Sequence, residues 1–319
     1  MGPVSFHNWQ LAVSGKPCLA TIEFPLFTDT DIVGELVGPQ YGPYQLINTV
    51  PIPPQARFRR PSLVLRVEWF VVQENPEAGR TRADEYHGGY VADEIAALLS
   101  LSLGVRLLAG GENRIFSEGK DPKGTPIAYG VTFDPTLPPL LGPHILPRAV
   151  ATATLDQHSL VSVLPTLSPS SASALVRSAR MYQEALRLVE NAPELSWLLL
   201  TSAVETAAND WSASEQSNRG RLEDSLPELV ALLQEIGVED SIDTIADIVS
   251  PKLGATRKFV DFLIAHLPVP PDSRPYAFAQ LPWEESKMRR ALSSIYRLRS
   301  QALHGGRPFP APMCQPPGS

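Results

Sequence analysis

The pattern of hydrophobic and polar residues changes halfway along this 319-residue chain. In the first half, short β-patterned runs at 18–24, 62–73 and 126–133 are separated by prolines and glycines. In the first run every second residue is apolar, which is typical of a strand with one buried face. One helical pattern, at 91–103, interrupts these runs. We therefore predict a β-rich N-terminal domain over residues 1–165.

Beyond that domain, apolar residues recur at steps of three and four, which lines one face of a helix. We expect helices at 171–191, from Pro193 onward, and at 225–236, 240–249, 252–266 and 282–303, with a polar loop at 211–224. Residues 166–307 should therefore form an all-α bundle, which makes the chain an α+β protein. The proline-rich residues 308–319 are expected to be a disordered tail.

The formal net charge of −7 argues against a protein that coats nucleic acid with its whole surface. A local basic stretch nevertheless ends the helical half. Residues 284–307 contain six lysines and arginines against two glutamates, a balance of +4. The plainer interpretation of such a cluster is a solvated helix face. A local phosphate-binding site is the alternative.

The two cysteines, Cys18 and Cys314, provide neither a disulfide framework nor a thiolate metal site, which suits a reducing cytoplasm. The N-terminus lacks the basic and apolar stretches of a signal peptide. No window offers the roughly 18 nearly uncharged apolar residues that a spanning helix needs. We therefore expect a cytoplasmic protein without a membrane partner, a metal ion or a cofactor.

The last expected helix carries a charge on its apolar face. Its stripe follows steps of four and three through Met288, Leu292, Ile295, Arg299 and Ala302. A charge at such a position needs a partner, and Glu205 interrupts the apolar run of the second helix. The sequence therefore predicts that Arg299 and Glu205 pair. Such a pair either holds two helices in register or belongs to a functional site.

His304 follows Arg299 by five residues and lies immediately before Gly305 and Gly306. In an unbroken helix the side chains of His304 and Arg299 would lie about 140° apart around the axis. Fraying of the helix end could bring them together, and so could a second subunit that supplies the missing half of a site. Alternatively, the histidine only makes a favourable contact with the helix C-terminus.

Residues 296–306, YRLRSQALHGG, resemble the signature of HEPN domains, which is an arginine, a polar residue, three variable residues and a histidine near the end of the last helix. They look particularly like the HEPN domains of ApeA-type proteins of bacterial anti-phage defence, where a Tyr, an Arg-Ser and a His-Gly fall at these places. The helix that carries Glu205 resembles the second helix of that family. The resemblance covers residues 170–307, and Leu98–Leu107 is weakly similar to the β-rich module of the same proteins.

The resemblance implies a homodimer that cuts RNA without a metal ion, as a toxin or abortive-infection effector. His304 would transfer protons at the 2′-hydroxyl, and Arg299 would hold the phosphate oxygens. Glu205 would orient that arginine, Ser300 would hydrogen-bond to phosphate, and Tyr296 would stack on a base or merely pack. The front domain would sense a phage-derived trigger, or an antitoxin would restrain the enzyme. The alternative is a non-catalytic HEPN module that binds RNA, a nucleotide or a partner.

The same spacing of arginine and histidine occurs once more, at Arg82 and His87. Spacing alone is therefore weak evidence for a functional motif. The second copy lies among acidic residues and glycines, with no helical stripe around it. We expect a loop there, in which Asp84, Glu85 and His87 are the groups that a metal ion could bind.

Overall fold

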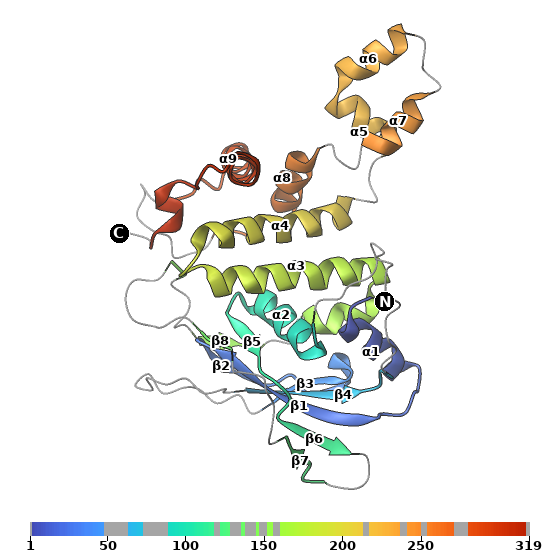
Figure 1. Cartoon of the computed structure of the whole chain (residues 1–319), viewed down its shortest axis with the longest axis vertical. Coiled ribbons are helices and arrows are strands. Elements are labelled where there is room, and N and C mark those ends of the chain that lie inside the picture. Colours follow the sequence, from blue (N-terminus) through green and yellow to red (C-terminus); the bar gives the residue numbers. More distant parts are fainter. Residues whose placement is uncertain are drawn as a thin grey trace. The chain divides into compact units, whose positions relative to one another are not determined.

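The computed structural model describes residues 2–47, 63–72, 89–117, 122–127, 135–137, 145–146, 152–155, 160–212, 217–236, 241–249, 254–270 and 280–316. They form an antiparallel sheet in the N-terminal half and helices that lie mostly in the C-terminal half, so the predicted α+β class is confirmed (Figure 1). The chain divides into two compact units, Met1–Ala203 with Pro310–Ser319, and Val204–Phe309. The division falls inside one helix, α4 (Pro193–Ser212).

Six described strands form the main sheet of the first unit. Their bounds are β1 (Ala20–Thr28), β3 (Tyr44–Ile47), β4 (Leu63–Trp69), β5 (Leu107–Ala109), β6 (Arg114–Ser117) and β7 (Thr125–Pro126). Strand β1 is central and pairs antiparallel with β4, β5 and β6, while β3 and β7 extend the order to β3-β4-β1-β6-β7. A separate parallel pair consists of β2 (Asp31–Val33) and β8 (Thr152–Thr154).

The strands predicted at 18–24 and 62–73 are confirmed as β1 and β4, which pair along most of their length. In β4 every second residue from Leu63 to Val67 is buried, which is the alternation of a strand with one face on the core. The run predicted at 126–133 lies largely outside the described residues, and only its first residue belongs to β7.

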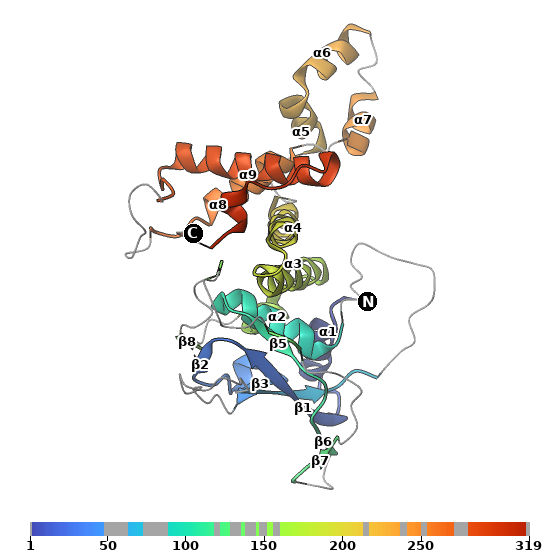
Figure 2. The ribbon, with the colours of Figure 1, turned by 60° about the vertical axis from the view of Figure 1, so that its left-hand side comes forward.

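Helix α2 (Val91–Leu103) lies between the sheet and α3 (Pro169–Leu188), and Figures 1 and 2 show this layering from two sides. One core joins the layers, because Leu65 of β4, Leu98 of α2 and Ala179 of α3 all belong to it and are at most 1% exposed. Contact with both neighbours explains why α2, predicted from its helical pattern, is buried nearly all round. The 3-10 helices η1 (Pro39–Tyr41) and η3 (Leu160–Thr166) contribute buried residues to the same core.

The apolar stripe of α3 packs onto this N-terminal core. Val176 and Ala179 of α3 are fully buried in the same cluster as the sheet and α2. For that reason α3 belongs to the first unit, and the chain passes from the first unit to the second between residues 203 and 204. The residue pattern changes earlier, near residue 165. The change from strands to helices along the sequence therefore does not coincide with the division between the two units.

Residues 308–316 carry more structure than the proline-rich sequence predicts. Within them lies a short 3-10 helix, η7 (Ala311–Cys314). The indole N–H of Trp197, on α4, donates to the Met313 carbonyl at 2.8 Å and ties this segment to the first unit. The expectation of a disordered tail therefore does not hold for residues 308–316.

The second unit contains the end of α4 and further helices, α5 (Asn218–Ser225), α6 (Pro227–Glu235), α7 (Ile242–Val249), α8 (Ala255–Ala265) and α9 (Glu285–Gly305). The four helices predicted beyond residue 224 are confirmed. The predicted loop at 211–224 is wrong at residues 211–212, which end α4, and from residue 218 onward, where the Ser217 hydroxyl caps α5 by accepting the Gly220 N–H at 3.1 Å. No helix among the described residues is both long and apolar enough to cross a membrane.

Helix α1 (Val4–Val13) has no pronounced apolar stripe and was not predicted from the sequence. It is fixed by a tertiary contact, because the buried carboxylate of Glu94, on α2, accepts the backbone N–H groups of Val4 and Ser5 at 3.1 and 2.8 Å. Such groups have no partner inside a helix, so Glu94 serves as their cap. Burial raises the pKa of Glu94 from 4.5 to about 7, although these hydrogen bonds act in the opposite direction.

The first unit should lose stability as the pH rises through about 7, because folding raises the pKa of Glu94. The folded unit binds this proton more tightly than the unfolded chain does. The resulting stability, up to about 3 kcal/mol, is complete below about pH 4.5 and is lost above about pH 7. Amide hydrogen exchange in α2 of wild-type and Glu94→Gln protein between pH 5 and 8 measures this effect in the first unit alone. Parallel pH profiles of the two proteins would contradict it.

Candidate functional site

The four motif residues Tyr296, Arg299, Ser300 and His304 lie on α9, which runs without a break to Gly305. The helix ends at the next residue, a glycine with a left-handed φ of 59°, whose N–H bonds to a carbonyl of the last turn. The idea that the helix frays and brings His304 toward Arg299 is therefore wrong. Five helical residues separate the two side chains by about 140° around the axis and about 7.5 Å along it.

Two side chains of α9 meet one carboxylate of α4. Tyr296 donates its hydroxyl to Glu205 Oε1 at 2.5 Å, and Arg299 donates from Nη2 to Glu205 Oε2 at 2.6 Å. The Arg299 guanidinium also lies over the Tyr296 ring, with its central carbon 5.6 Å from the ring centroid. The predicted pairing of Arg299 with Glu205 is therefore present, and 18% of each of these two side chains is exposed.

This contact does not satisfy Arg299 completely. Its Nε is buried and has no hydrogen-bond acceptor among the described residues. A buried donor without an acceptor costs roughly 1–3 kcal/mol, and folded proteins contain few of them. Because this Nε is shielded, an anion with several oxygens, such as a phosphate, reaches the guanidinium only through the 18% of the side chain that stays exposed.

Tyr296 is buried in the small core shared by α8 and α9, where its ring centroid lies 5.2 Å from that of Phe259. Burial, followed by the hydrogen bond to Glu205, raises the pKa of Tyr296 to about 12. The hydroxyl is therefore protonated at neutral pH and acts as a donor. A buried ring has no face free for a base, so the geometry favours packing over stacking. The signal in the sequence was the three-residue spacing from Arg299, which places both side chains on one helix face.

His304 and Ser300 lie outside this cluster. His304 is exposed in the last turn of α9, where a histidine interacts favourably with the C-terminal end of the helix dipole. Ser300 is half-buried, and its hydroxyl makes no hydrogen bond to another described residue. One copy of the chain thus brings Arg299, Glu205 and Tyr296 together, but not His304.

The basic residues of α9 differ in how they are paired. Lys287 and Arg289 form ion pairs with carboxylates, Arg289 with Asp261 of α8 at 2.6 Å. These two charges belong to an internally paired, solvated helix face. Arg297 and Arg307, closer to the motif, are exposed and form no ion pair with another described residue. Uncompensated positive charge therefore remains near Arg299 and His304.

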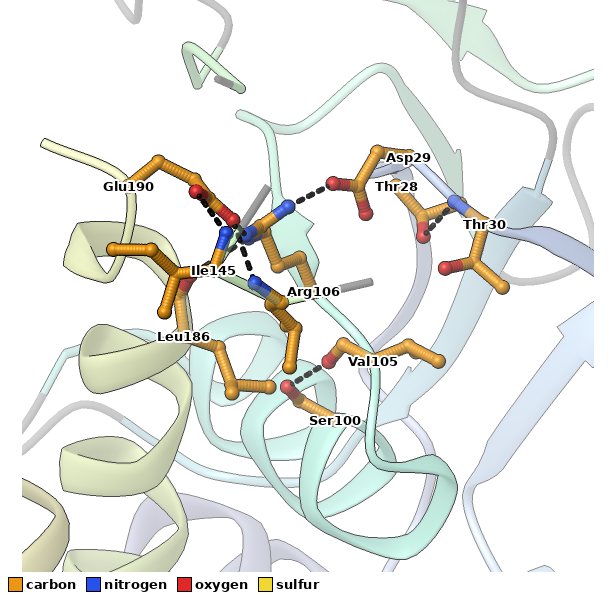
Figure 3. A network of polar contacts seen from close by, with 10 residues as sticks. Thr28, Asp29, Thr30, Ser100, Val105, Arg106, Ile145, Leu186 and Glu190 are labelled. Carbon is orange, nitrogen blue, oxygen red and sulfur yellow. Dashed lines mark hydrogen bonds and ion pairs between the residues drawn. The ribbon is translucent and has the colours of Figure 1, made fainter. Parts of the chain in front are cut away.

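A second charged cluster lies deeper, in the first unit (Figure 3). Arg106, with 1% of its side chain exposed, forms ion pairs with Asp29 and, at 2.8 Å, with Glu190. It also donates its Nε–H to the Leu186 carbonyl at 2.7 Å. Glu190 in turn accepts the backbone N–H groups of residues 145–146 at 2.8 and 3.0 Å. The network therefore joins the ends of β1 and α3, the start of β5 and this short segment.

The network around Arg106 is structural rather than a site. All three guanidinium nitrogens of Arg106 are engaged within it. Burial alone would raise the pKa of Glu190, but the backbone N–H groups and Arg106 outweigh that effect, and its pKa is lowered. A carboxylate stabilised in its charged form in this way has no proton to exchange near neutral pH.

The second copy of the arginine–histidine spacing, at 82–87, lies outside the described residues. Within the part of the chain that the structure describes, no group of three or more His, Cys, Asp or Glu side chains could hold a metal ion. Comparison of the chain with models of known protein families, with curated proteins and with solved structures finds no match. The features of this chain that indicate a function are therefore the geometry around Arg299 and the arginine–histidine motif.

Proposed function

We propose that this chain is a metal-independent endoribonuclease of the HEPN type, in which Arg299 and His304 act at a site completed by a second copy. The observation that carries the proposal is the state of Arg299, a charge on an apolar helix face that Glu205 holds through a single hydrogen bond and whose side chain remains 18% exposed. Such a guanidinium is suited to bind the oxygens of a phosphate diester.

The proposed reaction needs only these side chains and the RNA itself. His304, as a base, takes the proton of a 2′-hydroxyl, whose oxygen attacks the neighbouring phosphorus. The bond to the 5′-oxygen breaks, and a protonated histidine supplies the proton that this oxygen takes up. Arg299 stabilises the negative charge that develops on the non-bridging oxygens. The products are a 2′,3′-cyclic phosphate and a 5′-hydroxyl, and DNA, which lacks the attacking group, is not a substrate.

A second copy is part of the proposal because α9 presents its two motif side chains in different directions. A homodimer that brings Arg299 of one copy near His304 of the other would unite the phosphate-binding group with the proton carrier. Glu205 acts in it as the residue that orients Arg299. Ser300 offers a further hydrogen bond to the phosphate.

The resemblance to ApeA-type proteins supports a role as a toxin or abortive-infection effector of anti-phage defence, in the cytoplasm. In that role the first unit senses a phage-derived trigger, or an antitoxin restrains the nuclease. These assignments rest on the resemblance alone.

The first test is incubation of purified wild-type and His304→Ala protein with total cellular RNA. We expect RNA fragments with the wild type, none with the variant, and no cutting of DNA. Intact RNA in both reactions would overturn the nuclease and favour the alternative, a non-catalytic HEPN module that binds RNA, a nucleotide or a partner. The Glu205–Arg299 contact is compatible with that alternative, because an ion pair can hold α4 and α9 in register without any chemistry.

A further inference from the structure

Tyr296 and Arg299 share one carboxylate, and this sharing affects how the arginine is held. A carboxylate and a guanidinium frequently pair through two parallel hydrogen bonds, because two oxygens match two N–H groups. In this site Glu205 Oε2 accepts from Arg299 Nη2 at 2.6 Å, while Oε1 accepts the Tyr296 hydroxyl at 2.5 Å. The Tyr296 hydroxyl thus directs Oε1 to itself, and the buried Arg299 Nε has no acceptor among the described residues.

We propose that Tyr296 is a positioning residue, whose hydroxyl keeps Glu205 in a single hydrogen bond with Arg299 and so prevents a closed, two-bond ion pair. The inference rests on the proposed function, because it concerns the arginine that binds phosphate there. A guanidinium held by one bond retains N–H groups for phosphate oxygens. A guanidinium held by two is neutralised more fully and stabilises less well the charge that develops on the phosphate oxygens in the transition state.

The ring of Tyr296 has a separate effect from its hydroxyl. It is buried against Phe259 and supports the Arg299 guanidinium from one side at 5.6 Å. A cation–π contact of this kind holds an arginine without using any of its N–H groups. A phenylalanine can make the same contact, so Tyr296→Phe removes only the hydroxyl and tests its role alone.

The Tyr296→Phe variant should fold normally and melt at the wild-type temperature or above it, because Glu205 becomes free to bond Arg299 Nε as well. We expect kcat for RNA cleavage to fall roughly tenfold while KM changes less than about twofold, since the weakened contact is to charge that develops in the transition state. Tyr182→Phe, which alters a half-buried tyrosine of α3 in the first unit, is the matched control and should cleave at the wild-type rate.

Two further measurements test whether the Tyr296 hydroxyl acts on Arg299 through Glu205. In a Glu205→Gln background no charged two-bond pair can form, so adding Tyr296→Phe should change kcat by less than about twofold. The other readout needs no RNA. In isotope-labelled protein, the Nε–H resonance of Arg299, identified by its absence from Arg299→Lys, should move downfield in Tyr296→Phe as Nε gains an acceptor.

The inference is overturned if Tyr296→Phe cleaves RNA at the wild-type rate, if it loses stability in proportion to its activity, or if the Nε–H resonance does not move. Independent, additive losses of kcat from Tyr296→Phe and Glu205→Gln would also overturn it. Wild-type protein that leaves RNA intact would instead overturn the proposed function. In that case the Nε–H resonance alone decides whether Tyr296 holds the ion pair open.

Discussion

Replacement of Arg106 by alanine is expected to destabilise the first unit by roughly 3–5 kcal/mol, which is typical when one partner of a buried ion pair is removed. The change leaves Asp29 and Glu190, whose side chains are 1% and 12% exposed, without their shared cation. Glu190 keeps the N–H groups of residues 145–146 as donors. The larger part of the destabilisation should therefore come from Asp29.

Amide hydrogen exchange in β1 and α2 is the measurement that checks this expectation, because the two units can unfold separately and a global melt would mix them. The matched control is Arg187→Ala on α3, since Arg187 pairs with Glu184 and the two side chains are 40% and 41% exposed. An exposed pair of this kind contributes less than about 1 kcal/mol. If both variants lower protection equally, the network around Arg106 does not stabilise the unit as proposed.

The largest expected effect on activity comes from the motif itself. Arg299→Ala should lower the rate of RNA cleavage roughly 10²–10³-fold, and His304→Ala roughly 10²–10⁴-fold, the ranges found for loss of a charge-stabilising donor and of a proton-transfer group. Arg297→Ala is the matched control, because it removes the same charge from an exposed position of α9. It should retain activity within about twofold. A loss as large as that of Arg299→Ala would assign the effect to general basic charge.

Mixed assemblies test whether two copies form the site. Arg299→Ala and His304→Ala each cleave at least about a hundredfold more slowly alone, but a dimer with one copy of each still has one intact pair if the arginine and the histidine come from different copies. We expect cleavage to recover to roughly half of the wild-type rate, since one of two sites is restored. No recovery in a purified mixed dimer would contradict the two-copy site.

Much of the fold could be predicted because its periodicities are local. The alternation in β1 and β4 and the stripes of α3 and α9 depend on neighbouring residues of one element. The Arg299–Glu205 contact could also be predicted, because a charge on an apolar stripe and an acid inside an apolar run each need a partner.

The remaining features depend on contacts between distant residues, which periodicity does not contain. Helix α1 is fixed by Glu94, which lies 89 to 90 positions further along the chain than the two residues it caps. The apolar stripe of α3 was predicted correctly. The stripe does not indicate, however, that α3 packs on the core of the N-terminal half. The contact of Tyr296 could not be predicted either, because it depends on how the two oxygens of Glu205 are shared. One oxygen accepts from Tyr296 and the other from Arg299.

A metal-independent attack by the 2′-hydroxyl can be tested by mapping the RNA ends that wild-type protein produces in excess EDTA. We expect continued cleavage, with 2′,3′-cyclic phosphate and 5′-hydroxyl ends that disappear in His304→Ala. Cleavage that stops in EDTA, or ends that carry a 5′-phosphate and a 3′-hydroxyl, would contradict it.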